Sequence, residues 1–447
     1  MRPQRRTRRR EEVVAPRGRN PSPRLEVLCV GTELLAGRIN THMALLAPGL
    51  LGAAFPIARE TTVADSVAEI RDAATAALER SDMLLVTGGL GPTFDDLTRE
   101  GIAEALGVRM AYQPELFRAI ARRFRRYGRR VPEENKRQAY VLEGAAVLPN
   151  AVGSAPGQRI DSGGKTVFLL PGPASEMRPM FEGHVLPFLR RRAGGRVACK
   201  TILHLASIPE SSADELLAPL YRSAERRGVE FTILSPPGLV DLHVTATARS
   251  EREARRRLSE AAAAARRLVG RWVFGAGDET LESVAGDRLA RRGWTLATAE
   301  SCTGGEVSRR LTSVPGSSRY FLGGVVCYAD TAKLRELGVP GDVLKRHGAV
   351  SQACARAMAR GAQERWGADC ALAITGIAGP GGGTPAKPVG LVYLACAAPG
   401  GRVKVQRWNI PGDRDAVRRR ASIAALTLLL RSLVPDPSAC GEELLGI

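Results

Sequence analysis

A strand-to-helix turn at Thr298–Gly305 is the sequence feature that most constrains the fold of this chain. Trp294–Ala297, just before it, is predicted to be a short buried strand, and residues 307–314 keep the apolar spacing of one helix face. Ser301 and Thr303 are residue types that favour the N-cap position of a helix. The first turn of that helix would then offer unpaired amide hydrogens to an anion.

The same alternation of apolar runs, turns and amphipathic segments occurs near the start of the chain. Strands are predicted at Leu25–Val30, Thr62–Val63 and Asp82–Thr87, with helices at Thr41–Leu51 and Ser66–Arg80. This order is typical of an α/β fold with a parallel sheet covered on both faces. Ligands of such sheets bind beyond the carboxyl ends of the strands, so the turns there are the first places to look for a site.

Size and hydropathy favour a soluble protein with several domains. A chain of 447 residues is too long for one ordinary core. The best candidate for a membrane span is the apolar run Ile423–Leu430. It is short and lies between Arg420 and Arg431, so no membrane span is expected. The basic N-terminus is not followed by an apolar segment, and we therefore expect no signal peptide.

The formal net charge of +19 does not by itself predict a nucleic-acid partner. Only seven of the 65 basic residues are lysine, and much of the surplus arginine lies in Arg2–Arg24 and Arg122–Arg130. Such runs are usually solvated tails or faces, and residues 1–23 are predicted to be disordered. The eight cysteines are scattered without any Cys-x-x-Cys pair, which indicates reduced, mostly buried thiols and a cytoplasmic location.

Two predicted strand ends in the first 110 residues carry polar chemistry. A glycine loop at residues 88–93 can bring backbone amides against a phosphate. The two aspartates after it could either cap the helix predicted at Leu97–Leu106 or hold a divalent cation. The candidate residues at this end are Glu33, Gly88, Gly89, Gly91, Asp95, Asp96 and Thr98.

Several separated motifs in the last third of the chain share one resemblance. The motifs, in order, are Thr298–Gly305, Tyr328–Lys333, Gly348–Ser351, Thr375–Gly383, Gly412–Arg414 and Arg418. Together they resemble the C-terminal domain of the CinA family, the nicotinamide mononucleotide deamidases, from about Thr280 to about Leu430. The resemblance implies hydrolysis of nicotinamide mononucleotide to nicotinic acid mononucleotide and ammonia, in NAD salvage. It implies no cofactor for that reaction.

The N-terminal part resembles the N-terminal CinA domain, which is similar to the molybdopterin-binding fold of the MoaB and MogA proteins. The motifs that carry this resemblance are Gly31–Leu35, Gly89–Thr98, Gly153–Gly157 and Leu170–Pro173. It implies a metal-dependent ADP-ribose pyrophosphatase activity that uses Mg, Mn, Co or Ni, with Asp95 and Asp96 as candidate metal ligands. The chain departs from the family pattern at His42, where relatives usually have Asn, and around Val141–Leu142, where they usually have Pro.

A small α+β unit separates the two ends and is similar to a KH-type domain. Strands are predicted at Lys200–Leu205, Phe231–Leu234 and Leu242–Ala248, with helices at Ser211–Arg227 and Ala254–Val269. The unit lacks the Gly-x-x-Gly loop with which KH domains clamp RNA, so we expect a connecting module.

The family reaction requires a nucleophile, a base and donors for an oxyanion. Ser301 is the candidate nucleophile, with activated water as the alternative, and Cys302 is a rival without a histidine partner. No His-x-Asp relay is evident, so Lys333 is the candidate base, as in Ser–Lys hydrolases, with Tyr328 near it. Taken alone, a Tyr and Lys pair is more often a core aromatic and a solvated lysine.

Further residues are candidates for binding the substrate. Thr375 follows an apolar strand and could supply an oxyanion contact. Relatives usually have Asn at the position of Asp330, whose negative charge would favour the protonated form of the neighbouring lysine. The other candidates for substrate binding are Glu300, Thr303, Gly304, Gly305, Gly376, Gly379, Arg414 and Arg418.

These observations predict a cytoplasmic protein with three α/β or α+β domains, at residues 24–180, 181–276 and 277–435. The domains are expected to lie between an N-terminal tail at residues 1–23 and a second tail at residues 436–447. The expected partners are small nucleotides and a second copy of the chain, with no specific nucleic acid and no membrane. The competing interpretation is a non-catalytic scaffold associated with competence, which binds nucleotides at sites that have lost their activity.

Overall fold

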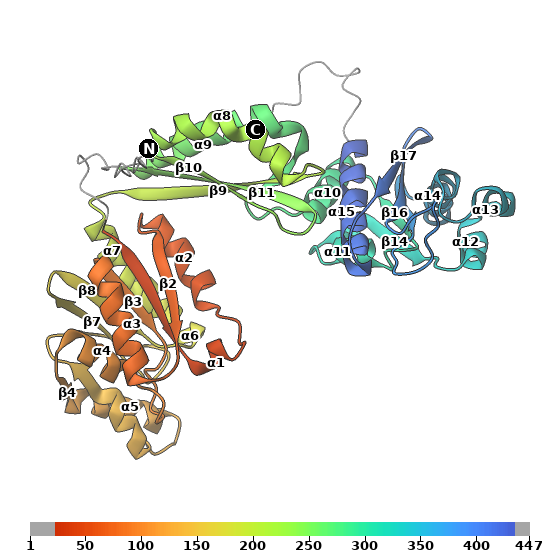
Figure 1. The fold of residues 1–447 in the computed structure, drawn as a ribbon. Coiled ribbons are helices and arrows are strands. Elements are labelled where there is room, and N and C mark those ends of the chain that lie inside the picture. Colours follow the sequence, from red (N-terminus) through yellow and green to blue (C-terminus); the bar gives the residue numbers. More distant parts are fainter. Residues whose placement is uncertain (1–22, 434–447) are drawn as a thin grey trace, which may run out of the picture. The chain divides into compact units, whose positions relative to one another are not determined.

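The computed structural model describes residues 23–433, and the tails predicted at residues 1–23 and 436–447 lie outside this range except for Pro23 (Figure 1). The chain folds as two compact units. The first ends at Cys199 and also contains Thr247–Glu251, whereas the second contains Lys200–Ala246 and the chain from Arg252 onwards. Between residues 23 and 433, no helix is both long and apolar enough to span a membrane.

The N-terminal domain is built on a six-stranded sheet with the order β2-β1-β3-β8-β7-β6. The first four of these strands are parallel, and β7 and β6 are antiparallel to their neighbours. The strands are β1 (Leu25–Val30), β2 (Ile57–Val63), β3 (Met83–Thr87), β6 (Ala146–Leu148), β7 (Gly157–Ser162) and β8 (Lys165–Leu170). A separate pair consists of β4 (Met110–Tyr112) and β5 (Tyr140–Leu142).

Helices bury both faces of this sheet, as the sequence predicts. Alternate residues of β1 divide between two cores: Val27 packs with Leu50 on one face, and Leu28 packs with Ile70 on the other. The helices are α1 (Thr32–Leu35), α2 (His42–Gly52), α3 (Val67–Arg80), α4 (Thr98–Leu106), α5 (Pro114–Arg126), α6 (Ala174–Met180) and α7 (Leu186–Arg192). The parallel strands therefore bring their carboxyl ends together at one edge.

The connecting domain is a four-stranded sheet with the order β10-β11-β9-β12, and its core also contains residues of two helices. Along β11 the buried and half-buried residues alternate, so only one face of the sheet is fully covered. Its elements are β9 (Val197–Ala206), α8 (Glu210–Glu225), β10 (Val229–Leu234), β11 (Leu239–Ala248), α9 (Glu251–Val269) and β12 (Val273–Ala276).

The C-terminal domain is a five-stranded sheet with the order β14-β13-β15-β16-β17. The strands β14, β13 and β15 are parallel, and β16 and β17 are antiparallel. The strands are β13 (Leu296–Glu300), β14 (Phe321–Val326), β15 (Cys370–Gly376), β16 (Leu391–Ala398) and β17 (Arg402–Asn409). The helices are α10 (Leu281–Arg292), α11 (Glu306–Thr312), α12 (Asp330–Leu337), α13 (Gly341–His347), α14 (Gln352–Trp366) and α15 (Arg414–Leu433).

Several predicted strands had wrong boundaries, and two of them lead into the candidate sites. The strand expected at Trp294–Ala297 is β13, which continues to Glu300, and the strand expected at Thr62–Val63 is β2, which already begins at Ile57. Hydropathy missed the end of β13 because its polar side chains are buried with partners. Thr298 lies 2.8 Å from the hydroxyl of Ser308, for example.

The cysteines agree with the prediction of reduced thiols. All seven within residues 23–433 are free, and six of them are buried, with Cys199 the exception. Cys440 lies outside the described residues.

The close contact of α14 with the end of α12 gives a stability prediction. A methyl group at Gly361 would lie 1.9 Å from the Leu337 carbonyl oxygen, which is backbone and cannot rotate away. Gly361→Ala should therefore lower the free energy of unfolding by about 1–3 kcal/mol, although alanine is the better helix former. Chemical denaturation measures this, with the exposed neighbour change Arg360→Ala as the control. A variant as stable as the wild type would contradict the packing.

Candidate active site

Three parallel strands end side by side in the C-terminal domain. Glu300 at the end of β13 is in register with Val326 of β14 and with Ile374 of β15. The next residue, Ser301, donates its amide hydrogen to the Ile374 carbonyl at 2.9 Å, and the Cys327 amide donates to the Glu300 carbonyl at 2.8 Å. Since neighbouring strands lie about 4.8 Å apart, the backbone of Ser301 has the ends of both neighbouring strands beside it.

The contacts of the Glu300 carboxylate show that two predictions for this turn are wrong, the side-chain cap of the helix and the free amides of its first turn. It is fully buried and accepts hydrogen bonds from the amides of Gly305, Val307 and Ser308, and from the Ser308 hydroxyl. The helix begins at Glu306 with no side-chain cap, so neither of the predicted N-cap residues caps it. The amides expected to be free for an anion are occupied, and Glu300 positions the turn from within.

Lys333 is buried, with 1% of its side chain exposed. Its Nζ donates to the carbonyl oxygens of Cys327 at 3.1 Å and Tyr328 at 2.9 Å. Asp330 lies 3.6 Å away, with its side chain 60% exposed. The alternative in which Lys333 is solvated and Tyr328 is a core aromatic is wrong on both counts, because Tyr328 is 59% exposed.

Two arginines at the start of α15 donate hydrogen bonds to the loops of the site. Arg414 donates to the Gly379 carbonyl at 2.8 Å and to the Tyr328 hydroxyl at 3.0 Å, and this hydrogen bond to Tyr328 raises the pKa of Arg414. Arg418 donates to the Thr303 carbonyl at 3.0 Å. The sequence predicted that the two arginines face the same site. In the structure Arg414 binds the loop at Gly379, and Arg418 binds the turn at Thr303.

The hydroxyl groups of the site differ in their availability. Thr375 donates its hydroxyl hydrogen to the Ala349 carbonyl at 2.8 Å, so this group accepts but does not donate as it stands. The sequence predicted that the Thr375 hydroxyl donates to an oxyanion, whereas in the structure its hydrogen is donated to Ala349. Thr303 is fully buried, and its hydroxyl has no hydrogen-bond partner within residues 23–433. A buried hydroxyl without a partner is costly, so Thr303 is the unsatisfied polar side chain of this turn.

Ser301 and Cys302 are adjacent but chemically unlike. Burial raises the pKa of the Cys302 thiol to about 12, so it is protonated near neutral pH and is a poor nucleophile. This agrees with the choice of Ser301. The side chain of Ser301 is 7% exposed.

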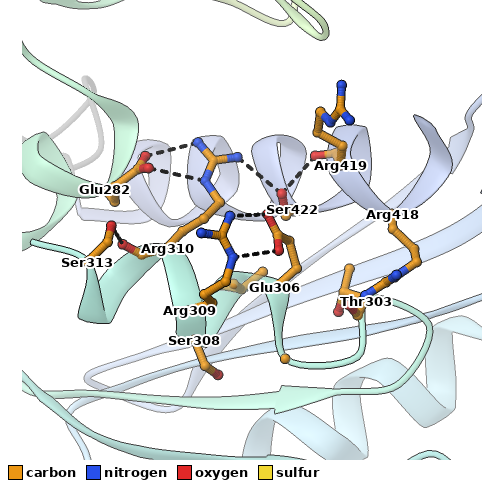
Figure 2. A network of polar contacts seen from close by, with 12 residues as sticks. Glu282, Thr303, Glu306, Ser308, Arg309, Arg310, Ser313, Arg418, Arg419 and Ser422 are labelled. Atoms are coloured by element: carbon orange, nitrogen blue, oxygen red, sulfur yellow. Dashed lines mark hydrogen bonds and ion pairs between the residues drawn. The ribbon is translucent and has the colours of Figure 1, made fainter. Parts of the chain in front are cut away.

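Arg310 fixes the helix that follows the turn. It forms a paired contact with Glu282 of α10, whose nearest distance is 2.9 Å, and donates to the Ser422 hydroxyl of α15 at 3.1 Å (Figure 2). The side chains of this ion pair are only 13% and 14% exposed. Figure 2 also shows Arg418 beside Thr303, so α15 is bonded both to the turn and to the helix that follows it.

Sequence reasoning missed one charged residue near this site. Lys387, in the loop between β15 and β16, donates to the His347 carbonyl at 2.7 Å. No signal in the sequence singled it out, since its partner is 40 residues away and is a backbone atom. The glycines Gly304, Gly305, Gly376 and Gly379 lie in or beside the loops just described, and Gly376 has the Leu391 carbonyl too close for a side chain.

The glycine loop of the N-terminal domain is held by its own aspartate. Asp96 accepts hydrogen bonds from the Gly91 amide at 2.7 Å, and from the amide and hydroxyl of Thr93. The Gly88 amide donates to the Leu170 carbonyl. Two of the amides predicted to receive a phosphate are therefore already bonded. The cap interpretation is also wrong, because α4 has no side-chain cap.

Two arginines that the sequence did not single out donate hydrogen bonds to the backbone carbonyls of this loop. Arg99 is 1% exposed and donates to the carbonyls of Leu90 and Gly91, and burial lowers the pKa of Arg99. Arg137 donates to the Thr93 carbonyl at 2.7 Å. The predicted site residue Thr98 likewise donates its hydroxyl to the Gly88 carbonyl at 2.9 Å, which makes it part of the support.

A cavity of about 590 Å³ opens above this loop. It brings together the strand ends singled out by the sequence, and it is lined by Glu33, Gly89, Asp95 and Asp96, with Ser154 and Pro171–Pro173 from the other two motifs. His42 also lines it, 2.9 Å from the Thr87 hydroxyl, and burial lowers the pKa of His42. The sequence did not predict the cavity's Glu176, which accepts from Asn150 at 2.7 Å.

The residues present do not form a resident metal site. Asp95 is exposed, and both oxygens of Asp96 already accept hydrogen bonds from the loop. Within residues 23–433, no three His, Cys, Asp or Glu side chains group as metal ligands. The predicted pair is thus insufficient alone. A Mg²⁺ ion commonly binds through one or two carboxylates together with substrate phosphates.

The folds and their sites define a protein with a molybdopterin-binding-type domain, a KH-type domain and a CinA-type domain. Residues 26–191 match the family described as probable molybdopterin binding domain, 200–275 the damage-inducible protein CinA KH domain, and 278–433 the CinA C-terminal domain. A putative competence-damage inducible protein of Symbiobacterium thermophilum is 45% identical over 92% of this chain and 98% of that protein. The chain therefore belongs to the CinA family.

A second relative has the same extent, and a solved structure covers about a third of the chain. A CinA-like protein of Dictyoglomus turgidum is 40% identical over 92% of this chain and 99% of its own length. A crystal structure of a CinA superfamily protein from Klebsiella pneumoniae is 38% identical, covers 34% of this chain and 95% of that one, and has a TM-score of 0.33.

The buried carboxylate at the end of β13 gives a prediction for stability and activity. Glu300→Gln replaces one acceptor oxygen by an amide NH₂ that faces backbone N–H groups, so buried donors lose their partner. The free energy of unfolding should fall by about 2–3 kcal/mol, and the activity of the domain with it. Denaturant titration and turnover measure these effects.

The matched control is Glu306→Gln, six residues on, whose carboxylate pairs with the exposed Arg309. It should change the free energy of unfolding by less than about 1 kcal/mol. Equal effects of the two substitutions would contradict the role of Glu300.

Proposed function

We propose that the C-terminal domain is an amidohydrolase that converts nicotinamide mononucleotide and water to nicotinic acid mononucleotide and ammonia, as part of NAD salvage. The observation that carries the proposal is the placement of Ser301 and Lys333 around adjacent strand ends. Ser301 lies between the strand ends that continue into Cys327 and Thr375, and the Lys333 amine binds the Cys327 carbonyl.

The two hydrogen bonds of Lys333 fix the position of its amine, which acts as a base in this proposal once it has lost a proton. A neutral amine has two N–H donors and one lone pair, and both donors are used by the carbonyls of Cys327 and Tyr328. The lone pair would then face away from these carbonyls and accept the proton of the nucleophile. That nucleophile is the Ser301 hydroxyl or, as the alternative, a water molecule.

Thr303 is the side-chain donor that we assign to the substrate. Its buried hydroxyl is without a partner among the described residues, and an amide oxygen that becomes negatively charged would supply one. In this proposal Thr375 orients the loop at Ala349, and Arg414 and Arg418 hold the loops that enclose the substrate. No cofactor is required in this scheme, and a cytoplasmic homodimer is the assembly that we propose.

Ammonia release from nicotinamide mononucleotide by the purified protein tests the function directly. Activity that persists in the presence of a chelator fits the Ser–Lys scheme. A non-catalytic scaffold would release no ammonia under any of these conditions, so this measurement separates the two classes.

Substitution of the adjacent side chains tests the nucleophile. Ser301→Ala should lower kcat on the order of 10³-fold, whereas Cys302→Ala should retain turnover because its thiol is protonated and buried. Steady-state kinetics on both variants decide this, with circular dichroism to confirm folding. Loss of turnover in Cys302→Ala alone would reverse the assignment.

The ion pair of Lys333 gives a second kinetic prediction. Asp330 lies 3.6 Å from the amine and pairs with its charge. Because a base acts through its uncharged form, Asp330→Asn should leave kcat unchanged or raise it. Steady-state kinetics on the variant measure this. A collapse of turnover in Asp330→Asn would mean that the carboxylate has another role in the site.

We propose as a second function that the N-terminal cavity binds a nucleotide or pterin-like phosphate. The supporting observation is the convergence of four separated motifs on a cavity of about 590 Å³. Cleavage of ADP-ribose, with Mg, Mn, Co or Ni added, is the activity to assay. Glu33→Gln and Glu176→Gln are the informative variants, since both side chains line the cavity.

A further inference from the structure

The cations around the proposed active site differ in how far their charge is already neutralised. Arg418 and Lys333 each lie beside an aspartate, at 3.8 Å and 3.6 Å. Arg414 and Lys387 instead donate to neutral oxygen atoms, and neither forms an ion pair within residues 23–433. A cation without a counter-charge beside a substrate site is available to a substrate anion.

Lys387 is held in place by backbone atoms. It closes a turn with Thr384, in which the two residues exchange backbone hydrogen bonds of 2.8 Å and 3.1 Å. Its ammonium reaches the His347 carbonyl at 2.7 Å, and a methyl group on Gly348 would lie 3.1 Å from it. One N–H of the three is used there, so two donors remain for a ligand.

The segment that anchors Lys387 also contacts the site. Ala349, two residues after His347, accepts the hydroxyl hydrogen of Thr375 at the end of β15. The Cys354 thiol lies within electrostatic range of both Lys333 and Lys387. Lys387 therefore belongs to the same group of loops as the proposed base, although no sequence motif pointed to it.

The helix that follows Ser301 cannot supply the phosphate site. The carboxylate of Glu300 already accepts the amides of Gly305, Val307 and Ser308. A phosphate at that position would also lie against a buried negative charge. The anionic end of a mononucleotide must therefore be bound by other groups.

We propose that Lys387 binds the 5′-phosphate of the mononucleotide substrate, with Arg414 as the second cation of that subsite. The two residues attach to the Gly/Pro-rich loop between β15 and β16, Arg414 at the Gly379 carbonyl and Lys387 as part of the loop itself. This assignment rests on the proposed function and adds the residue that distinguishes a nucleotide from a nucleoside.

Removal of the phosphate from the ligand tests the assignment. Binding of nicotinamide mononucleotide and nicotinamide riboside is measured by calorimetry in a Ser301→Ala background, which prevents turnover, with and without Lys387→Met. Lys387→Met should weaken mononucleotide binding about 10- to 100-fold and riboside binding less than about 2-fold. Steady-state kinetics on Lys387→Met with Ser301 intact should show a rise of the same size in KM for the mononucleotide, with kcat little changed.

The matched control is Lys404→Met. Lys404 on β17 also donates to a backbone carbonyl, that of Arg431 at 3.4 Å, but it is not among these loops, and its substitution should change neither ligand. Equal weakening of both ligands by Lys387→Met would show that the lysine only fixes the loop, and no change in either would also overturn the proposal. A wild type that releases no ammonia refutes the deamidase, whereas the binding comparison still decides the role of Lys387.

Discussion

The buried carboxylate of Glu300 is the interaction on which the C-terminal site depends. Its oxygens accept four hydrogen bonds from the start of α11, across a turn that contains Ser301, Cys302 and Thr303. An internal anion at a helix N-terminus satisfies donors that would otherwise be orphaned, and it complements the helix dipole. The turn is thereby held by the residue that ends the strand, and the hydroxyls between the two anchor points keep fixed positions.

The other polar residues of the site are attached mainly to backbone carbonyls. Each of five side chains donates to a backbone carbonyl oxygen around the site, and two of them share the segment at His347–Ala349: Lys333, Thr375, Lys387, Arg414 and Arg418. Such bonds hold the loops together without consuming the charge of the cations. This framework fixes the side chains that the proposed substrate would contact.

The glycine loop of the N-terminal domain uses the same kind of support. Asp96 binds the loop amides from one side, and Arg99 binds the carbonyls of Leu90 and Gly91 from the other. Gly88 has a positive φ and lies so close to the Val30 carbonyl that a side chain would collide with it. The loop shape thus comes from Asp96, which the sequence assigned to a ligand, and from Arg99, which the sequence did not single out.

From the sequence alone the fold class could be predicted, because apolar periodicity and glycine turns are local signals, and the separated motifs identified the family by resemblance. The sequence did not determine which polar groups were free. Glu300, Asp96 and Thr375 were expected to face a ligand, but their bonds go to neighbouring backbone. Arg99 and Lys387 carried no local pattern. Only the tertiary structure decided these roles, since partners such as Thr303 and Arg418 lie 115 residues apart in the chain and meet only after the sheet has formed.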